Sequence, residues 1–329
     1  MATDNFSVHL ISLNDIREAE ERISKHIHRT PVFTSRQADE KAGRRLFFKA
    51  ENLQKTGSFK VRGALNAVLK GKEENAGWNG VVTHSSGNHG QALSFASSIA
   101  GIPGYVVVPE MAPQVKKDAI RGYGAHLIEC GPKTVDRYET CALLQKEKNL
   151  EVIPSSDHVD VIAGQGTIAT EFLEEVPDLD AILVSVSGGG MAAGVCVAAK
   201  SIKPDIKVYL VTPKGKGLEE CLRAGQRLWT GPPQYLDTIA DGIKLRHCGF
   251  ITTQILIDLA EKEVFDMDDD DMIAAMKFSF EKMKLVIEPA AGATVAAAFS
   301  DKFQKLDSSL ENIGVVLCGG NLDIEQLPW

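Results

Sequence analysis

The sequence lacks paired cysteines, clustered histidines, a basic stripe and a long apolar run. Its six cysteines are scattered over 329 residues without a Cys-x-x-Cys pair, which argues against a disulfide scaffold or a zinc module. A formal net charge of −8 argues against a nucleic-acid surface. No apolar stretch is long enough to cross a bilayer, and we expect no signal peptide. These absences predict a cytoplasmic protein with reduced thiols, no nucleic-acid partner and no membrane partner.

Short apolar runs alternate with amphipathic segments along the chain. Runs rich in Val, Ile and Leu predict strands at residues 45–51, 80–86, 105–109, 126–130, 181–187, 207–212 and 313–318. Segments such as residues 91–100 and 113–123 have a helical pattern. Such alternation predicts the α/β class, with open parallel sheets and helices on both faces. Ser12 and Asp15 have the spacing of a helix cap, so we also expect a helix near the N-terminus.

Four predicted strands are followed by turns of small residues. The turns are Lys-Thr-Gly-Ser-Phe-Lys-Val-Arg-Gly-Ala at 55–64, His-Ser-Ser-Gly-Asn-His-Gly at 84–90, Ser-Gly-Gly-Gly-Met at 187–191 and Cys-Gly-Gly-Asn at 318–321. Open α/β sheets bind their ligands at the carboxyl ends of the strands. The four turns therefore predict a single ligand that is held from several sides.

Lys60 is the most informative residue in these turns. It lies where Gly57 and Ser58 give way to a predicted helix, and the positive end of a helix dipole lowers the pKa of a nearby amine. A lysine with a lowered pKa can attack an aldehyde and form a Schiff base. An isolated lysine would more often be a solvated surface residue, but the other three turns favour a chemical role.

The glycine run 187–191 predicts a phosphate-binding loop. A glycine run between a strand and a helix leaves backbone N–H groups free for a phosphate, and the helix dipole adds attraction. The alternative is a dinucleotide fold, because Gly188, Gly190 and Ala193 fit its fingerprint loosely. That fold requires an acid at the end of the next strand, where this chain has Thr212. A purely structural tight turn is the other alternative.

Together these motifs resemble the fold-type II pyridoxal-phosphate enzymes, which have a tryptophan synthase β-like fold, and within them the serine racemase and serine/threonine dehydratase branch. The likeness covers nearly the whole chain and includes residues 161–167, 238–242 and 287–292. An ordered set of motifs is a far more specific signal than any one of them. The resemblance implies pyridoxal 5′-phosphate as cofactor, a homodimer and two domains. These would be a large domain formed by 1–79 plus 156–329 and a small inserted domain at 80–155, with the cofactor in the cleft.

The resemblance also implies which residues hold the cofactor. The implied set is Lys60, Phe59, Asn88, Ser187, Gly188, Gly189, Gly190, Met191 and Cys318. Lys60 would carry the cofactor, Asn88 would contact its phenolic oxygen, and Cys318 would face the pyridine nitrogen. Unlike a carboxylate, a neutral S–H does not force the pyridine nitrogen to stay protonated. The ring is then a weaker electron sink, which suits racemisation or β-elimination. A buried, inert cysteine is the alternative interpretation of Cys318.

For the substrate the resemblance implies Ser85, Ser86, Asn88, His89 and Arg137. Racemisation requires an acid or base on each face of a planar carbanion, and Ser86 would face Lys60 across it. Alternatively, Ser86 binds the substrate carboxylate and transfers no proton. Arg137 would pair with that carboxylate, or would be one of the many solvated helix arginines. For His89 a structural hydrogen bond is the alternative.

Two segments bear on metals. Serine racemases of animals bind a divalent cation through carboxylates just after the strand that matches 207–211, where this chain has Thr212, Lys214 and Lys216. We therefore expect no metal there, although Glu219 or Glu220 could rebuild the site. The acidic run 266–272 resembles a calcium loop but lacks its glycine and glutamate, so an acidic helix start is expected instead.

The resulting prediction is a pyridoxal-phosphate-dependent serine racemase that also eliminates water from serine and threonine, giving a 2-oxo acid and ammonia. A dedicated L-serine/threonine dehydratase is the first alternative. An aspartate racemase is another, because Ser155 and Ser156 lie where related enzymes alter substrate choice. A catalytically silent binding protein would not need Lys60, and a Rossmann-type reductase conflicts with Thr212.

Overall fold

The computed structural model describes residues 11–74 and 77–329, and their strands form two sheets. The six-stranded sheet has the order β1–β2–β10–β7–β8–β9, and every neighbouring pair is parallel except β1 and β2. Its strands are β1 (Val32–Thr34), β2 (Arg45–Lys49), β10 (Asn312–Val316), β7 (Ala181–Ser185), β8 (Lys207–Pro213) and β9 (Val264–Met267). The four-stranded sheet is wholly parallel, with the order β5 (His126–Cys130), β4 (Gly104–Pro109), β3 (Val81–His84) and β6 (Glu151–Val152).

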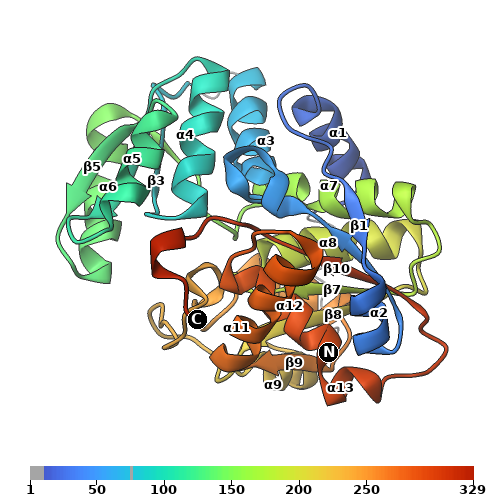
Figure 1. Ribbon diagram of the computed structural model, residues 1–329. Helices are drawn as coiled ribbons and strands as arrows, with labels where there is room; N and C mark the ends of the chain where they lie inside the picture. The colour runs from blue at the N-terminus through green and yellow to red at the C-terminus, as the bar shows by residue number, and fades with distance from the viewer. Residues whose placement is uncertain (1–10, 75–76) are drawn as a thin grey trace.

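Helices cover both sheets. Those next to the four-stranded sheet, at the upper left of Figure 1, are α4 (Asn88–Ala100), α5 (Gln114–Gly122) and α6 (Thr134–Lys148). The other helices are α1 (Leu13–Ile23), α2 (Arg36–Ala42), α3 (Lys60–Glu73), α7 (Val159–Glu175), α8 (Gly190–Ile202), α9 (Leu218–Ala224), α10 (Phe250–Leu259), α11 (Asp269–Phe278), α12 (Pro289–Phe299) and α13 (Asp301–Gln304). Short 3-10 helices occupy Glu51–Leu53, Lys55–Gly57, Asp241–Ile243 and Ile324–Gln326, and a π-helical turn occupies Ser279–Met283.

The larger core lies around the centre of the six-stranded sheet. All five residues of β7 are buried, as expected for a parallel strand that is covered on both faces. Helix α7 packs directly on β10, since a Cβ at Gly314 would lie 2.7 Å from the ring of Phe172. The position therefore requires glycine for this close approach.

The seven predicted strands are all present, but several end earlier than predicted. The strand predicted at 45–51 ends at Lys49 and a 3-10 turn follows, the one at 80–86 covers Val81–His84, and the one at 181–187 ends at Ser185. The strand predicted at 313–318 runs from Asn312 to Val316. Beyond β3, β7 and β10, small residues form the turn that carries a candidate site residue. Strands β1, β6 and β9, which have three, two and four residues, were not predicted.

Two predictions of helix starts are confirmed. Ser12 caps α1, and Asp15 returns the contact in a capping box. In the acidic run, Asp266 and Met267 end β9 and Asp268 caps α11, so the run is indeed an acidic helix start.

The predicted insert coincides in part with the smaller sheet. All four of its strands lie between residues 80 and 155. However, the core beneath this sheet also includes Ile23 of α1, Val61 and Leu65 of α3 and Val161 of α7. Because apolar side chains cross the proposed boundaries, the domain limits stay a prediction.

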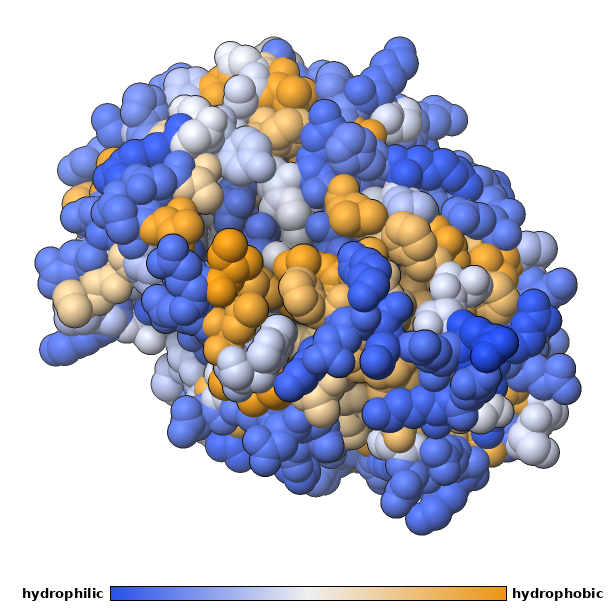
Figure 2. Space-filling model, in the orientation of Figure 1, coloured by the Kyte–Doolittle hydropathy of each residue, from blue (hydrophilic) through white to orange (hydrophobic). Residues whose placement is uncertain are grey.

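The surface seen from the side of Figure 1 is mostly polar, with apolar residues gathered near the middle of the face (Figure 2). Among the helices that the structure describes, none is both long enough and apolar enough to cross a membrane.

Candidate active site

The segment that carries Lys60 is joined by backbone contacts to the turn after β10. Thr56 and Gly57 have φ values of 62° and 71°, and this left-handed bend reverses the chain before α3 begins at Lys60. The Phe59 N–H donates to the Cys318 carbonyl at 3.1 Å, and the Gly320 N–H donates to the Gly57 carbonyl at 2.9 Å. Two of the four predicted turns are therefore held together by main-chain hydrogen bonds.

The amine of Lys60 reaches a third segment. Its Nζ donates to the carbonyl of Ser155 at 2.6 Å and lies 5.1 Å from the centre of the Phe59 ring. Burial lowers the pKa of Lys60 to about 8, while Cys318 and Glu288 act in the opposite direction. The lowered pKa agrees with the sequence argument, but its main cause is burial rather than the helix N-terminus.

Asn88, at the start of α4, joins the small sheet to the same site. Its Nδ2 donates to the two carboxylate oxygens of Glu288 at 2.9 and 3.0 Å. Its Oδ1 accepts from Asn321 Nδ2 at 2.9 Å, and Asn321 also donates to the Thr56 carbonyl at 2.7 Å. The turn at 84–90 is thereby tied to the turns at 55–64 and 318–321.

Glu288 is a site residue that sequence reasoning missed. It precedes α12, 6% of its surface is exposed, and its N–H donates to the Gly319 carbonyl at 3.0 Å. Burial raises the pKa of Glu288 to about 7, although the hydrogen bond from Asn88 favours the charged form. The available signal was an acid between apolar Ile287 and the run Pro-Ala-Ala, where a solvated carboxylate is unexpected.

The glycine run forms the remaining wall. A Cβ at Gly188 would lie 2.2 Å from Ser156 Oγ, and one at Gly190 would lie 2.8 Å from the Ser156 carbonyl oxygen, so these positions have no room for a side chain. Gly189 precedes α8 with φ 95° and offers the helix no side-chain cap. The first N–H groups of α8 therefore lack both an intrahelical partner and a capping side chain. This donor set suits the phosphate of pyridoxal phosphate, and with Lys60 it fits that cofactor.

Cys318 lies in the turn after β10 and is predicted to contact the cofactor. Only 2% of its surface is exposed. Burial raises the pKa of its thiol, and the neighbouring Glu288 raises it further. The side chain is therefore a neutral S–H at physiological pH.

The predicted substrate residues lie in two groups. Ser85 and Ser86 are half-buried at the end of β3, and Ser85 Oγ accepts from the Gly87 N–H at 3.3 Å. His89 is 2% exposed, its pKa is lowered to about 3 by burial, and its Nε2 lies 2.9 Å from the Ile153 carbonyl. A neutral, enclosed ring that bonds to the backbone favours the structural alternative for His89.

Arg137 lies apart from this group, on α6. It neighbours His84. Burial lowers the pKa of His84, and the charge of Arg137 lowers it further. The His84 ring packs on Tyr138, with the ring centroids 4.3 Å apart. The Nε of Arg137 is buried and has no hydrogen-bond partner among the described residues. No described contact connects Arg137 with Lys60.

The turn after β8 does not fit the divalent cation that the resemblance implies. Thr212 presents a hydroxyl that donates to Asp266, and the ammonium of Lys216 points at backbone carbonyls. Of the two proposed substitutes, Glu219 already contacts Arg223 at 2.7 Å and the Val264 N–H at 3.0 Å, and Glu220 is exposed in the first turn of α9. No three acidic, histidine or cysteine side chains in residues 11–74 and 77–329 gather as a metal site.

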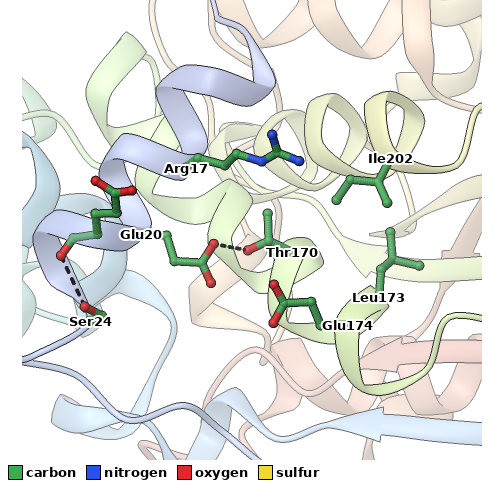
Figure 3. Close-up of a pocket in the computed structure, with 8 residues that line it drawn as sticks. Arg17, Glu20, Ser24, Thr170, Leu173, Glu174 and Ile202 are labelled. Atoms are coloured by element: carbon green, nitrogen blue, oxygen red, sulfur yellow. Dashed lines mark hydrogen bonds between the residues drawn. The ribbon is translucent and has the colours of Figure 1, made fainter.

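A separate groove of about 490 Å³ lies between α1, α7 and α8 (Figure 3). Its lining contains none of the predicted site residues, and Glu20 accepts a hydrogen bond from Thr170 there at 2.9 Å. The lining residues are Arg17, Glu20, Glu21, Ser24, Thr170, Leu173, Glu174 and Ile202. We assign this groove no part in the candidate site.

A lysine with a lowered pKa, an uncapped glycine loop and a neutral thiol, all following parallel strands, fit an enzyme that uses pyridoxal phosphate. The chain belongs to the family described as pyridoxal-phosphate dependent enzyme, whose model matches residues 23–319. The predicted family and fold class are confirmed.

Within this family, the chain is similar to racemases over almost its whole length. It is 43% identical over 320 residues to serine racemase from Dictyostelium discoideum, covering 96% of this chain and 97% of that protein. The crystal structure of that serine racemase gives a TM-score of 0.89. The crystal structure of a pyridoxal 5′-phosphate-dependent aspartate racemase gives a TM-score of 0.94 at 58% identity, covering 97% of this chain and 98% of that one. Serine racemase from Homo sapiens is 43% identical over 328 residues, covering 97% and 94%.

Proposed function

We propose that this protein is an amino-acid racemase that uses pyridoxal phosphate to interconvert L-serine and D-serine and that also eliminates water from serine and threonine. The observation that carries the proposal is that Asn88, from the turn after β3, and the segment just before Lys60 meet in one set of contacts around Glu288 and Asn321. The similarity to serine racemases supports the substrate.

Lys60 and Ser86 are the two proton-transfer groups of the proposal. With a pKa of about 8, a fraction of the Lys60 amine is free at neutral pH to hold the cofactor and, once the substrate amine has displaced it, to remove the α-proton. The half-buried hydroxyl of Ser86 would deliver a proton from the other face. If the carbanion instead expels the β-hydroxyl, the product hydrolyses to a 2-oxo acid and ammonia.

The remaining residues bind and orient. The N–H groups of residues 187–191 would hold the phosphate, Asn88 would contact the phenolic oxygen, and Phe59 would pack beside the ring. The neutral thiol of Cys318 would face the pyridine nitrogen without forcing it to stay protonated. When bound, the cofactor supplies an electron sink for the α-carbanion. Arg137 and Ser85 would bind the substrate carboxylate, and we further propose a cytoplasmic homodimer.

Aspartate is the second candidate substrate. The specific observation in its favour is the 58% identity to an aspartate racemase, which exceeds the 43% identity to the serine racemases. Ser155 and Ser156 lie against Lys60 and the glycine run, where a substrate side chain would be sensed. Under this proposal the loop at Ser155 and Ser156 sets the choice between serine and aspartate, because both substrates share the α-carboxylate that Arg137 would bind.

The test begins with the purified protein and its visible absorbance. Borohydride reduction followed by peptide mapping should place a pyridoxyl group on Lys60. Chiral chromatography after incubation with L-serine, L-threonine and L-aspartate should then detect D-serine as the racemised product. If D-aspartate accumulates faster than D-serine, the second candidate replaces the first, and if only 2-oxo acids form, the enzyme is a dehydratase.

Ser86→Ala provides the mechanistic test. We expect it to reduce conversion of L-serine to D-serine by more than about a hundredfold, the lower end for a positioned proton donor. Elimination from L-serine should survive, because it needs the Lys60 face alone. Ser85→Ala is the matched control and should affect both reactions to a similar, smaller degree. Equal losses of both reactions in Ser86→Ala would mean that Ser86 only binds substrate.

A further inference from the structure

A lysine is buried directly behind the glycine run. Lys216 lies between β8 and α9, and 3% of its surface is exposed. Gly215 and Gly217 on either side have φ values of 88° and 67°, and these left-handed positions let the turn direct the side chain inward. The Nζ donates to the carbonyl of Ser187 at 2.8 Å and also to the carbonyl of Leu245.

This ammonium has no acidic partner in the described part of the chain. The side chains that bear on its charge are the thiols of Cys248 and Cys221, and neither is a carboxylate. Burial lowers the pKa of Lys216 accordingly. A buried charge that backbone carbonyls alone compensate is costly, and a nearby anion would stabilise it.

The contact with Ser187 also sets the direction of the next N–H group. In a planar trans peptide the C=O and the following N–H point in opposite directions. Because Lys216 holds the Ser187 carbonyl, to which the Cys248 thiol also donates more weakly at 3.6 Å, the Gly188 N–H points away from Lys216. The Gly188 carbonyl accepts from Thr252 Oγ1 at 2.7 Å and from the Gly249 N–H at 3.1 Å, which turns the Gly189 N–H away in the same manner. Neither N–H has an acceptor among the described residues.

We propose that Lys216 is a positioning residue for the phosphate of the cofactor. It holds the Ser187 carbonyl so that the Gly188 N–H faces the phosphate. It also supplies a fixed positive charge on the other side of the Ser187–Gly188 peptide from the phosphate. The inference rests on the proposed binding of pyridoxal phosphate by the 187–191 loop. The loop is then held by a covalently attached cation rather than by an exchangeable one.

The test compares two lysine variants of the holoenzyme. Lys216→Met removes the charge with little change of volume, and Lys214→Met is the control, because Lys214 in the same turn is exposed and contacts Asp268 at 2.5 Å. Equilibrium dialysis measures the affinity for pyridoxal 5′-phosphate and, separately, for pyridoxal without its phosphate. We expect Lys216→Met to weaken pyridoxal phosphate by about tenfold or more, in the range for hydrogen bonds from charged groups. Pyridoxal binding should change little, and Lys214→Met should resemble the wild type.

Additional measurements separate failure of this inference from failure of the proposed function. EDTA should leave the affinity of the wild type for pyridoxal phosphate unchanged, whereas a magnesium-reversible loss would overturn the proposal. Equal weakening of pyridoxal and pyridoxal phosphate by Lys216→Met would also overturn it, as would identical behaviour of the two variants. If Lys216→Met does not fold, Lys216→Gln removes the charge while retaining a hydrogen-bond donor. This variant should still bind pyridoxal phosphate more weakly than the wild type does, while its affinity for pyridoxal should not change. If the wild type binds neither compound, the proposed function fails rather than this inference.

Discussion

The buried carboxyl of Glu288 makes the stability of the protein depend on pH. Burial raises the pKa of Glu288 from an ordinary 4.5 to about 7, so the folded state keeps a proton that the unfolded state has lost between these values. Stability should therefore fall as the pH rises through that window, by about 3 kcal/mol in total at about 1.4 kcal/mol per pKa unit. Above a pH of about 7 this contribution is lost and the slope from Glu288 disappears.

Glu288→Gln tests this dependence. The amide cannot ionise, so the decline in the free energy of unfolding between a pH of about 4.5 and about 7 should become shallower. Urea unfolding at a series of pH values measures it. Glu281→Gln, in the exposed turn before residue 285, is the control and should retain the wild-type slope. A slope unchanged by Glu288→Gln would show that another group titrates.

The sequence made some site residues easier to predict than others. The four turns of small residues could be predicted because each follows an apolar run, whereas the roles of Asn88 and Cys318 within them came from the family resemblance. Glu288 could not be predicted, because its role depends on burial against Asn88, which is 200 positions away in the chain. Tertiary contacts of this kind leave no periodic signal.

At the scale of elements, α3 is anchored by a buried ionic network two residues after Lys60. Arg62, which has no exposed surface, donates to Glu51 at 2.8 Å and to Glu171 at 2.7 Å, and Lys49 also contacts Glu171 at 2.7 Å. The network joins β2, the following 3-10 turn, α3 and α7. It was not predicted, since Arg62 was read as part of a motif and its partners are distant in sequence.

Arg62→Leu should destabilise the fold by about 3–5 kcal/mol, because it leaves two buried carboxylates without their main partner. Arg36→Leu is the matched control: Arg36 forms an exposed pair with Glu40 at 3.1 Å, and exposed pairs contribute at most about 1 kcal/mol. Urea unfolding of the two variants provides the comparison. A loss below about 1 kcal/mol in Arg62→Leu would show that the carboxylates find other partners or take up protons without penalty.

The strands of the two sheets differ in how well the sequence predicts them. β7 and β4 were predicted because parallel strands covered on both faces read as continuous apolar runs. Strands β1 and β6 pair at the edges of their sheets and are two or three residues long, so neighbouring strands rather than their own sequence decide their conformation. Local pattern therefore specified the central strands and the five-residue edge strand β5, and left these shortest edge strands open.

In the molecule as a whole, an ion pair bridges elements that belong to different sheets. Lys116 of α5, which packs on the four-stranded sheet, contacts Asp241 of a 3-10 helix at 2.8 Å, and that 3-10 helix packs against α12. Lys244 contacts the other carboxylate oxygen of Asp241 at 2.7 Å from within the same loop. The pKa of Asp241 is lowered to about 2 because both cations favour its charged form despite burial.

Lys116→Met should therefore alter how the two sheets approach each other across the candidate site, while leaving the fold intact. An exposed pair is worth up to about 1 kcal/mol, so we expect KM for the amino-acid substrate to rise by up to about fivefold with little change in Tm. Raising the salt concentration should raise KM of the wild type toward that of the variant, because salt screens the pair. Lys244→Met removes the other cation that pairs with Asp241, but it leaves the contact between Lys116 and Asp241 in place. This variant should therefore have a KM near the wild-type value. Equal effects of the two variants would mean that Asp241 acts within its own loop and that the bridge between the sheets has no part in substrate binding.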